Sequence, residues 1–173
     1  MKKILAIVIA MFTTTSLYSQ TPEDKLKQSG ITLPVAQKPV ANYVNAVRVG
    51  NLIFLAGKGP AKPDGTNITG KVGKDLSIQQ GYDAARLTGI NQLAVLKTEL
   101  GSLNKVKRIV KVLGMVNCSE DFADQPKVIN GYSDLMVEIF GENGKHARAA
   151  VGMYALPSNI AVEVEMVVEV YPD

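Results

Sequence analysis

The sequence predicts an α+β fold, a two-layer sandwich in which two helices cover one face of a β-sheet, with the order β-β-α-β-α-β-β. Two long segments, 77–100 and 124–140, place apolar residues at helical spacing. Five shorter segments around them are rich in alternating or β-branched residues, as strands are. Helices of this kind pack on one sheet face, so the other face is either solvated or covered by another subunit. The long last strand, apolar on one side, favours a homo-oligomer.

The N-terminus has the three parts of a secretory signal peptide, which we expect to span residues 1–19. Lys2 and Lys3 form a basic start, 4–12 is an apolar run, and 13–19 is small and polar. The run is shorter than the about 20 residues that span a bilayer, and no cysteine lies nearby to take a lipid, so no stable membrane anchor is expected. These features predict export, to the periplasm in a bacterial host. The alternative is a buried N-terminal strand.

Residues 20–41 are expected to form an N-terminal arm, with room for a helical turn at Pro22–Gln28, that leads into one domain over 42–173. The domain opens with a hairpin: residues 43–49 alternate in the β manner, Gly50-Asn51 turns the chain, and 52–56 is a short buried strand. A glycine- and proline-rich connector follows over 57–65. Its glycine spacing does not match a phosphate-binding loop, so a plain connector is favoured over one whose backbone N–H groups line a site.

Capping signals delimit both helices. Ser77 and Gln80 form a capping box before the first helix, which runs to Leu100 with Gly101 as its terminator. Asp124 is expected to cap the second helix, which ends at Gly141. Between the helices, 106–116 is rich in β-branched residues and is predicted to be a strand, with Lys105, Lys107 and Lys111 facing outward.

The last two predicted strands, 148–154 and 160–171, contain the most informative charged residues. Arg148 opens the first, while Glu163 and Glu165 share one face of the second because side chains alternate along a strand. We expect Arg148 and a glutamate at neighbouring strand positions, where the guanidinium binds a small carboxylate beside an acid/base group. The alternative is a structural salt bridge of Arg148 to Glu163, Glu165 or a partner subunit.

Two motifs resemble those of a known family. The segment from Tyr43 through Val49-Gly50-Asn51 to Gly59-Pro60 is similar to the first half of the Rid family signature, and Arg148-Ala149-Ala150-Val151 through Leu156-Pro157 to Glu165 resembles its C-terminal signature. This family is also called the YjgF or endoribonuclease L-PSP family of reactive-intermediate deaminases. The resemblance covers about 42–170, and the order of elements between the motifs agrees. It points to a divergent, chorismate mutase-like branch.

The resemblance implies a chorismate mutase-like fold, a homotrimer with sites in clefts between subunits, and hydrolysis of 2-imino acids to 2-oxo acids and ammonia without a cofactor. Arg148 resembles the arginine that binds the substrate carboxylate, and Glu163 the glutamate that positions water. Tyr43 matches a cleft tyrosine, and Asn130 resembles an asparagine of the second helix. Ala56 and Gly57 match the strand-end substrate position, and Ala150 a further cleft position.

Three positions in these motifs depart from the family pattern. Ala56 stands where active members have a serine, Ala150 where they have a cysteine, and Lys58 where glutamine is common. The first two changes remove polar groups from the implied site. They weaken the expectation of imine deaminase activity without removing it.

Composition excludes several classes of site and partner. The formal charge is +3, and removal of Lys2 and Lys3 lowers it to +1, so no basic surface for nucleic acid is expected. One cysteine, Cys118, at the end of an apolar run, is expected to be a buried, inert thiol. The single His146 is expected to be a solvated loop residue, with general base as the alternative. No residues stand at metal-ligand spacing, so neither a metal nor another cofactor is expected.

Three functions from different classes remain at this point. The first is an exported Rid-like enzyme that hydrolyses a small imine or enamine carboxylate. The second is a non-catalytic protein that binds a small carboxylate metabolite, which the alanines at positions 56 and 150 favour. The third is a stress-related interaction protein that acts through the trimer surface and whose function would not depend on Arg148.

Overall fold

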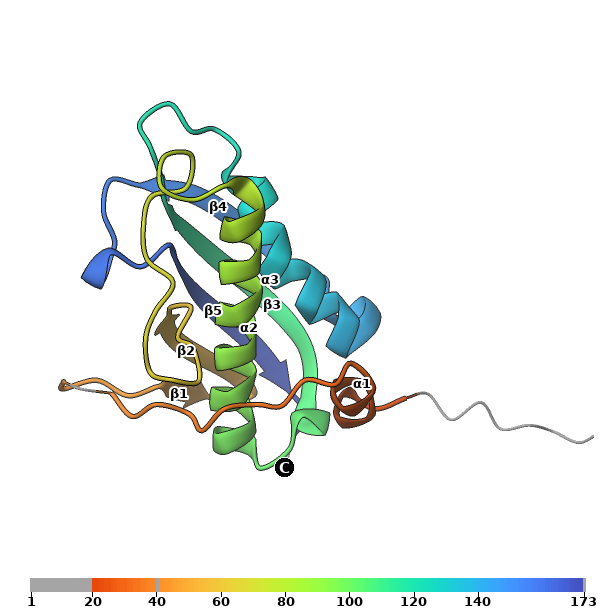
Figure 1. Ribbon diagram of the computed structural model, residues 1–173. Coiled ribbons are helices and arrows are strands. Elements are labelled where there is room, and N and C mark those ends of the chain that lie inside the picture. The colour runs from red at the N-terminus through yellow and green to blue at the C-terminus, as the bar shows by residue number, and fades with distance from the viewer. Residues whose placement is uncertain (1–19, 40, 173) are drawn as a thin grey trace, which may run out of the picture.

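The computed structural model describes residues 20–39 and 41–172; the predicted signal peptide lies outside them. The helices are α1 (Pro22–Gln28), α2 (Ile78–Leu100) and α3 (Gln125–Phe140), and short 3-10 turns lie at Leu103–Lys105, Gly141–Gly144 and Pro157–Asn159. The strands are β1 (Ala46–Val49), β2 (Leu52–Lys58), β3 (Val106–Asn117), β4 (Ala147–Met153) and β5 (Val162–Val170). Helices α2 and α3 cover one face of a five-stranded sheet (Figure 1), which confirms the predicted two-layer α+β fold.

The sheet has the strand order β1-β2-β5-β3-β4. Strands β3 and β4 are parallel, with Val112 opposite Arg148, while the other pairs are antiparallel. The parallel pair follows from its connection, because α3 carries the chain back across the sheet before β4 begins. Strand β3 therefore lies between β4 and β5. The expectation that Arg148 and Glu163 occupy neighbouring strands is wrong for this reason.

Alternation along the strands separates a helix-facing side of the sheet from an open side. On β3 and β5, Val112, Val116, Val162, Val164 and Met166 point into the core and are almost fully buried. Gly114 belongs to the same face, where a Cβ atom would lie 2.6 Å from Ile129 Cδ1. The open side instead exposes apolar side chains, among them Val47, Val49, Phe54 and Val151.

The ends of α2 match the sequence prediction, whereas the start of α3 differs. At the start of α2, Ser77 Oγ accepts from the Gln80 N–H at 3.2 Å and Gln80 Oε1 accepts from the Ser77 N–H at 2.8 Å, which completes the capping box. At its end, Gly101 adopts the left-handed conformation with φ 76°. Asp124 stands at the N-cap of α3, but its side chain makes no capping hydrogen bond. Its carboxylate pairs with Lys127 instead, at 3.1 Å.

The hairpin differs from its predicted bounds at both ends. β1 starts at Ala46 rather than at residue 43. Asn45, just before it, links β2 to the arm, since its carbonyl accepts from the Ala56 N–H at 2.9 Å and its Nδ2 donates to Gln37 O at 2.8 Å. β2 continues to Lys58, with an irregular register between Leu55 and Lys58 opposite β5. Gly57 and Lys58 therefore belong to the sheet and not to the connector.

The N-terminal arm packs against the domain. Helix α1 forms where the helical turn was expected, and its own residue Leu26 is buried. Glu23 Oε2 pairs with Lys97 Nζ at 2.7 Å, and Glu23 Oε1 accepts from the Leu103 N–H at 2.9 Å. Beyond α1 the arm crosses the lower part of α2 before it reaches β1 (Figure 1).

Candidate functional site

Arg148 lies on β4 with its side chain against α3. Its NH1 group donates to Asn130 Oδ1 at 2.9 Å and to Ser133 Oγ at 3.0 Å. Both partners are uncharged, and among the ion pairs of residues 20–39 and 41–172 none includes Arg148. A salt bridge to Glu163 or Glu165 within the chain is therefore wrong. Two neutral acceptors fix the guanidinium and leave its charge available to an anion.

His146 continues this hydrogen-bond chain. Its Nδ1 lies 2.7 Å from Gly144 O, so this nitrogen carries the proton, and its Nε2 accepts from the Ser133 hydroxyl at 3.1 Å. Ser133 thus accepts from Arg148 and donates to His146. Burial lowers the pKa of His146, and the nearby Arg148 cation lowers it further, against the opposing effect of the Gly144 hydrogen bond. His146 is half-buried and hydrogen-bonded, so the expectation of a solvated loop histidine is wrong.

Glu163 lies on the open side of the sheet, above Gly57. It stands opposite Met115 in the β3–β5 pair, and its side chain is half-buried. A Cβ atom on Gly57 would fall on Glu163 Oε1 and lie 3.0 Å from its Cδ. Burial raises the pKa of the Glu163 carboxyl, and the like charge of Glu165 raises it further. A carboxylate in such a setting is a better proton acceptor than an exposed one.

Ala56 stands at the irregular stretch of β2, and both of its backbone groups already have partners. Its N–H donates to Asn45 O at 2.9 Å, and its carbonyl accepts from Gln92 Nε2 at 3.1 Å. The same Gln92 nitrogen donates to Val164 O at 2.9 Å, which ties the irregular stretch to β5. Within this chain, the Ala56 N–H is therefore already bonded and is not available to a substrate.

Single-chain geometry separates the predicted site residues into two groups. Arg148 and Asn130 are together on the helix side, and Ala150 follows on the same face of β4, opposite Gly114. Glu163 and Gly57 are together on the open side. From the register, Arg148 and Glu163 are two strands and three residues apart, about 10 Å along the strands and about 10 Å across them.

Tyr43 lies apart from both groups. It precedes β1, at the sheet edge opposite β4, and half of its side chain surface (50%) is exposed. The β1 strand that it precedes is four strand spacings, about 19 Å, from β4 across the sheet. One chain alone therefore does not bring all the predicted residues into one site.

The structure adds Ser133, which the sequence prediction did not include, and His146, which it treated as a solvated loop residue with general base as the alternative. A signal for Ser133 was present, because Asn130 and Ser133 are three residues apart and share one face of a helix. For His146, its place two residues before Arg148 gave no such signal. Its contact with Ser133 depends on how the loop after α3 turns onto β4.

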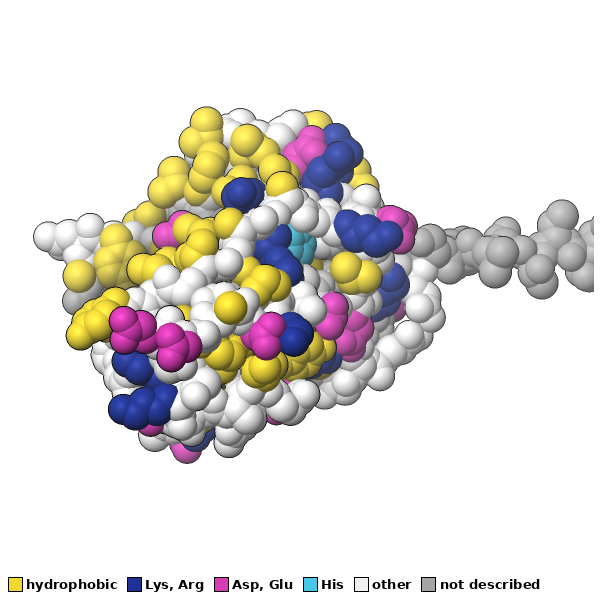
Figure 2. All heavy atoms as spheres, turned by 90° about the horizontal axis from the view of Figure 1, so that it is seen from above, with side chains coloured by type: hydrophobic (Ala, Val, Ile, Leu, Met, Phe, Trp, Pro, Cys, Tyr) yellow, Lys and Arg dark blue, Asp and Glu magenta, His cyan; other side chains and the backbone are white. Residues whose placement is uncertain are grey.

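Neither metal-ligand clusters nor spanning helices are found in the part of the chain that the structure describes. Within it, no three potential ligands among His, Cys, Asp and Glu come together, and no helix combines the length and hydropathy needed to cross a membrane. Cys118 is buried, as expected. Figure 2 shows hydrophobic side chains gathered along one side of the molecule and charges of both signs interspersed over the rest of that view.

Comparison with known proteins agrees with this fold. The family model described as "YjgF/chorismate_mutase-like, putative endoribonuclease" matches residues 23–170. Protein TCP17 of Trypanosoma cruzi is 41% identical over 145 residues, which are 83% of this chain and 91% of that protein. The crystal structure of the protein Atu1372, of unknown function, from Agrobacterium tumefaciens has a TM-score of 0.81 at 42% identity, covering 87% of this chain and 92% of that one.

A relative with a named activity is the 2-iminobutanoate/2-iminopropanoate deaminase of Dermatophagoides farinae. It is 31% identical over 139 residues, which are 80% of this chain and 93% of that protein. Fold and sequence together define an α+β protein of the chorismate mutase-like class. The chain belongs to the YjgF/chorismate mutase-like family, within which Rid-type imine deaminases are found among its relatives.

Proposed function

We propose that the protein hydrolyses a small 2-imino acid, or the corresponding enamine, to a 2-oxo acid and ammonia. The observation that supports this most is Arg148, whose guanidinium is fixed by Asn130 and Ser133 but makes no ion pair with a carboxylate among the described residues. A guanidinium held by neutral acceptors matches the planar carboxylate of an imino acid. The named activity of the Dermatophagoides farinae relative supports the same chemistry.

The reaction needs a held carboxylate, a positioned water and a proton acceptor. In the proposed mechanism Arg148 binds the substrate carboxylate and Glu163 takes a proton from water as its oxygen bonds to the imine carbon. The imine nitrogen takes up this proton as the C=N bond becomes a single bond, which gives a carbinolamine. Loss of the hydroxyl proton then forms the C=O bond of the 2-oxo acid as the C–N bond breaks, and the nitrogen takes up that proton and leaves as ammonia. The raised pKa of Glu163 suits this exchange, since the same carboxyl group accepts a proton from water and returns it to the leaving nitrogen.

The proposed site is shared between subunits of a homotrimer. Arg148 and Glu163 lie on opposite faces within one chain, so a cleft that contains both requires Glu163 of a second copy. Tyr43, near the β1 edge, is positioned to approach the β4 edge of a neighbour in the same way. The side chains of Val47, Phe54 and Val151 are apolar and exposed on the open face, and a neighbouring subunit packed on this face would remove them from water. Sedimentation velocity of the purified protein tests the trimer.

Export is a separate part of the proposal. We expect residues 1–19 to be removed on secretion to the periplasm, and N-terminal sequencing of the protein from its host tests this. An exported enzyme meets imines other than those formed by cytoplasmic enzymes. The substrate is therefore defined here by its chemistry, a small carboxylate with an adjacent C=N bond.

The deciding experiment measures loss of 2-iminopropanoate, generated in situ, in the presence of the protein. Arg148→Ala removes the cation, and Arg148→Lys keeps the charge without the planar fork. We expect turnover by the native protein, at least about a hundredfold loss of kcat/KM in Arg148→Ala and a partial loss in Arg148→Lys. No acceleration over buffer by a folded trimer refutes the deaminase proposal.

A second function, binding of a small carboxylate without turnover, is favoured by one observation. Ala56 and Ala150 bring no hydroxyl or thiol to the site, and the Ala56 backbone groups are already bonded. Carboxylate binding that depends on Arg148, in a protein without imine turnover, supports this alternative. The endoribonuclease part of the family description finds no support here, since the chain has one histidine and a formal charge of only +3.

A further inference from the structure

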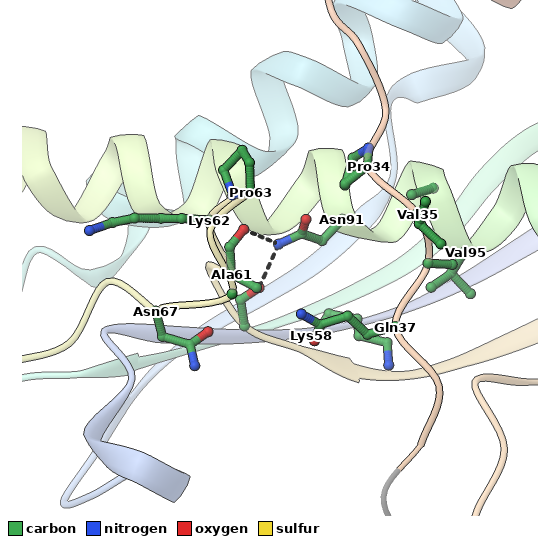
Figure 3. Close-up of a pocket in the computed structure, with 14 residues that line it drawn as sticks. Pro34, Val35, Gln37, Lys58, Ala61, Lys62, Pro63, Asn67, Asn91 and Val95 are labelled. Atoms are coloured by element: carbon green, nitrogen blue, oxygen red, sulfur yellow. Dashed lines mark hydrogen bonds between the residues drawn. The ribbon is translucent and has the colours of Figure 1, made fainter.

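A second cavity lies on the helix side of the sheet at the end of β2, on the face opposite to Glu163 and at the other edge of the sheet from Arg148. Its volume is about 360 Å³, and its walls come from the arm, from α2 and from the connector after β2. Figure 3 shows Gln37 of the arm, Lys58 of β2, and Asn91 and Val95 of α2 around this space. The volume is at the lower end of the range for small-molecule sites, about 300–1,000 Å³.

Lys58 is the charged group in the wall of this cavity. It stands opposite Val164, which faces the core, so its side chain runs along the helix side of the sheet. Its Nζ donates to Asn45 Oδ1 at 2.6 Å, and no ion pair of the described residues includes it. Burial lowers the pKa of Lys58. A half-buried cation with only a neutral partner is unfavourable unless an anion joins it.

Hydrogen bonds hold the walls around Lys58 in place. Asn91 Nδ2 donates to Gly59 O at 3.0 Å and to Ala61 O at 3.1 Å, which fixes the connector against α2 (Figure 3). On the other side, Asn45 accepts from Lys58 and donates to Gln37 O at 2.8 Å. The same asparagine therefore links the cation to the arm that covers the cavity.

The remaining wall is largely apolar. Pro34 and Ala36 of the arm face Ala94 and Val95 of α2, and both α2 residues are almost fully buried. Lys62 also borders the cavity, but Figure 3 shows its side chain pointing away from the other labelled residues. One cation beside an apolar wall suits a ligand with one negative end and one apolar body.

We propose that this cavity is a binding site for a small monocarboxylate of about ten heavy atoms, with its carboxylate on Lys58 and its apolar part against the arm and α2. The site is distinct from the proposed deaminase site and does not depend on it. Within one chain its cation is on β2 and its walls are the arm and α2, whereas Arg148 is on β4 at the other edge of the sheet. The link through Asn45 predicts that the ligand also orders the arm.

Phenylacetate is the probe that tests this site, since it has one carboxylate and one aromatic body. Two-dimensional ¹H–¹⁵N NMR of the full chain follows its titration, with phenylacetamide as the neutral counterpart and inorganic phosphate as the anion without an apolar body. We expect saturable shifts for the amides of Gln37, Lys58 and Asn91. We expect binding of phenylacetamide and of phosphate to be at least about tenfold weaker, because each lacks one of the two interactions.

Variants assign the binding to Lys58. Lys58→Met is expected to weaken phenylacetate at least about tenfold, while Lys58→Arg stays near the native affinity. Lys74→Met, which removes an exposed lysine away from the cavity, is the control and should bind as the native protein does. Arg148→Ala removes the cation of the proposed deaminase site and tells binding there from binding at Lys58. Should Lys58→Met fail to fold, Lys58→Gln keeps a donor to Asn45 and replaces it.

Four results overturn the proposal. If the folded Lys58→Met or Lys58→Gln variant binds phenylacetate with native affinity, Lys58 has no role in binding. If phenylacetamide binds as tightly as phenylacetate, the charge of the ligand has no role. If phosphate binds as tightly as phenylacetate, the apolar part of the ligand does not contribute to binding. Binding lost in Arg148→Ala but kept without Lys58 assigns phenylacetate to the other site. Because the readout is binding and not turnover, a protein without deaminase activity still tests this proposal.

Discussion

Replacement of Gly57 by alanine tests the link between Gly57 and Glu163 more directly than removal of the glutamate. The new Cβ atom falls on Glu163 Oε1 and lies 3.0 Å from Cδ and 3.1 Å from Cγ. Because ordinary contacts between such atoms are about 3.5 Å or longer, the carboxylate must move by about 1 Å or more. Gly57→Ala therefore leaves the glutamate in the chain but moves it off its position.

The expected effect is large on activity and small on stability. A misplacement of about 1 Å in a catalytic group costs about a hundredfold in rate, which corresponds to about 2.7 kcal/mol in the activation free energy. The atoms that must move belong to one flexible side chain, so the clash itself costs little. Gly57 is not among the positive-φ residues, and an alanine there also stabilises by about 0.4–1 kcal/mol through the unfolded chain. The unfolding free energy should therefore change by less than about 1 kcal/mol.

The assay combines kcat/KM for 2-iminopropanoate with urea unfolding of the same preparation. Gly114→Ala is the matched control, because its Cβ atom meets three atoms of Ile129 at 2.6–2.7 Å in the core while Glu163 is left in place. That variant should lose about 1–3 kcal/mol of stability and keep its activity while folded. Native turnover in Gly57→Ala refutes the assignment of Glu163 as the proton acceptor in its observed position.

The remaining predictions concern the hydrogen-bond chain behind Arg148. Since folding lowers the pKa of His146 below its ordinary value of 6.5, the unfolded chain takes up the proton first as pH falls, and stability drops below that pH by at most about 1.4 kcal/mol per pH unit. His146→Asn should remove this component from the difference between unfolding curves at pH 7 and pH 5, and an identical slope in the variant contradicts it. The single histidine also gives one ¹H NMR titration, whose midpoint should lie below 6.5. Ser133→Ala should cost about 1 kcal/mol of stability and raise KM more than it lowers kcat, because it releases the guanidinium rather than the proton acceptor. A native KM in Ser133→Ala shows that Arg148 does not need this support.

The elements of the fold could be predicted from the sequence because their signals are local. The capping box at Ser77, the glycine that ends α2 and the β-branched run of β3 each act within a few residues. The boundaries that differed depend on distant partners. The side chain of Asn45, just before β1, bonds to the arm, and β2 extends to Lys58 because Lys58 pairs with Val164 of β5.

The candidate site, like the fold, could be predicted from the sequence where the signal is local, but not where it depends on distant partners. Period-two alternation predicted that Glu163 and Glu165 share a face, and the resemblance singled out Arg148 and Asn130, whose side chains do meet at 2.9 Å. Sequence alone did not indicate that β3 lies between β4 and β5, because strand order depends on how α3 crosses the sheet. The register decides that Arg148 and Glu163 face opposite sides, because their partners on β3, Val112 and Met115, are three residues apart.

By itself, then, the sequence determined which segments become helices and strands, which faces are apolar, and which residues bear the charges. Tertiary structure decided which of those charges meet. It placed Ser133 and His146 behind Arg148, set Glu163 on Gly57, and left Lys58 half-buried beside a cavity. The physical reason is that side-chain periodicity is a property of one segment, whereas strand order and helix docking are set by the burial of apolar surface over the whole chain.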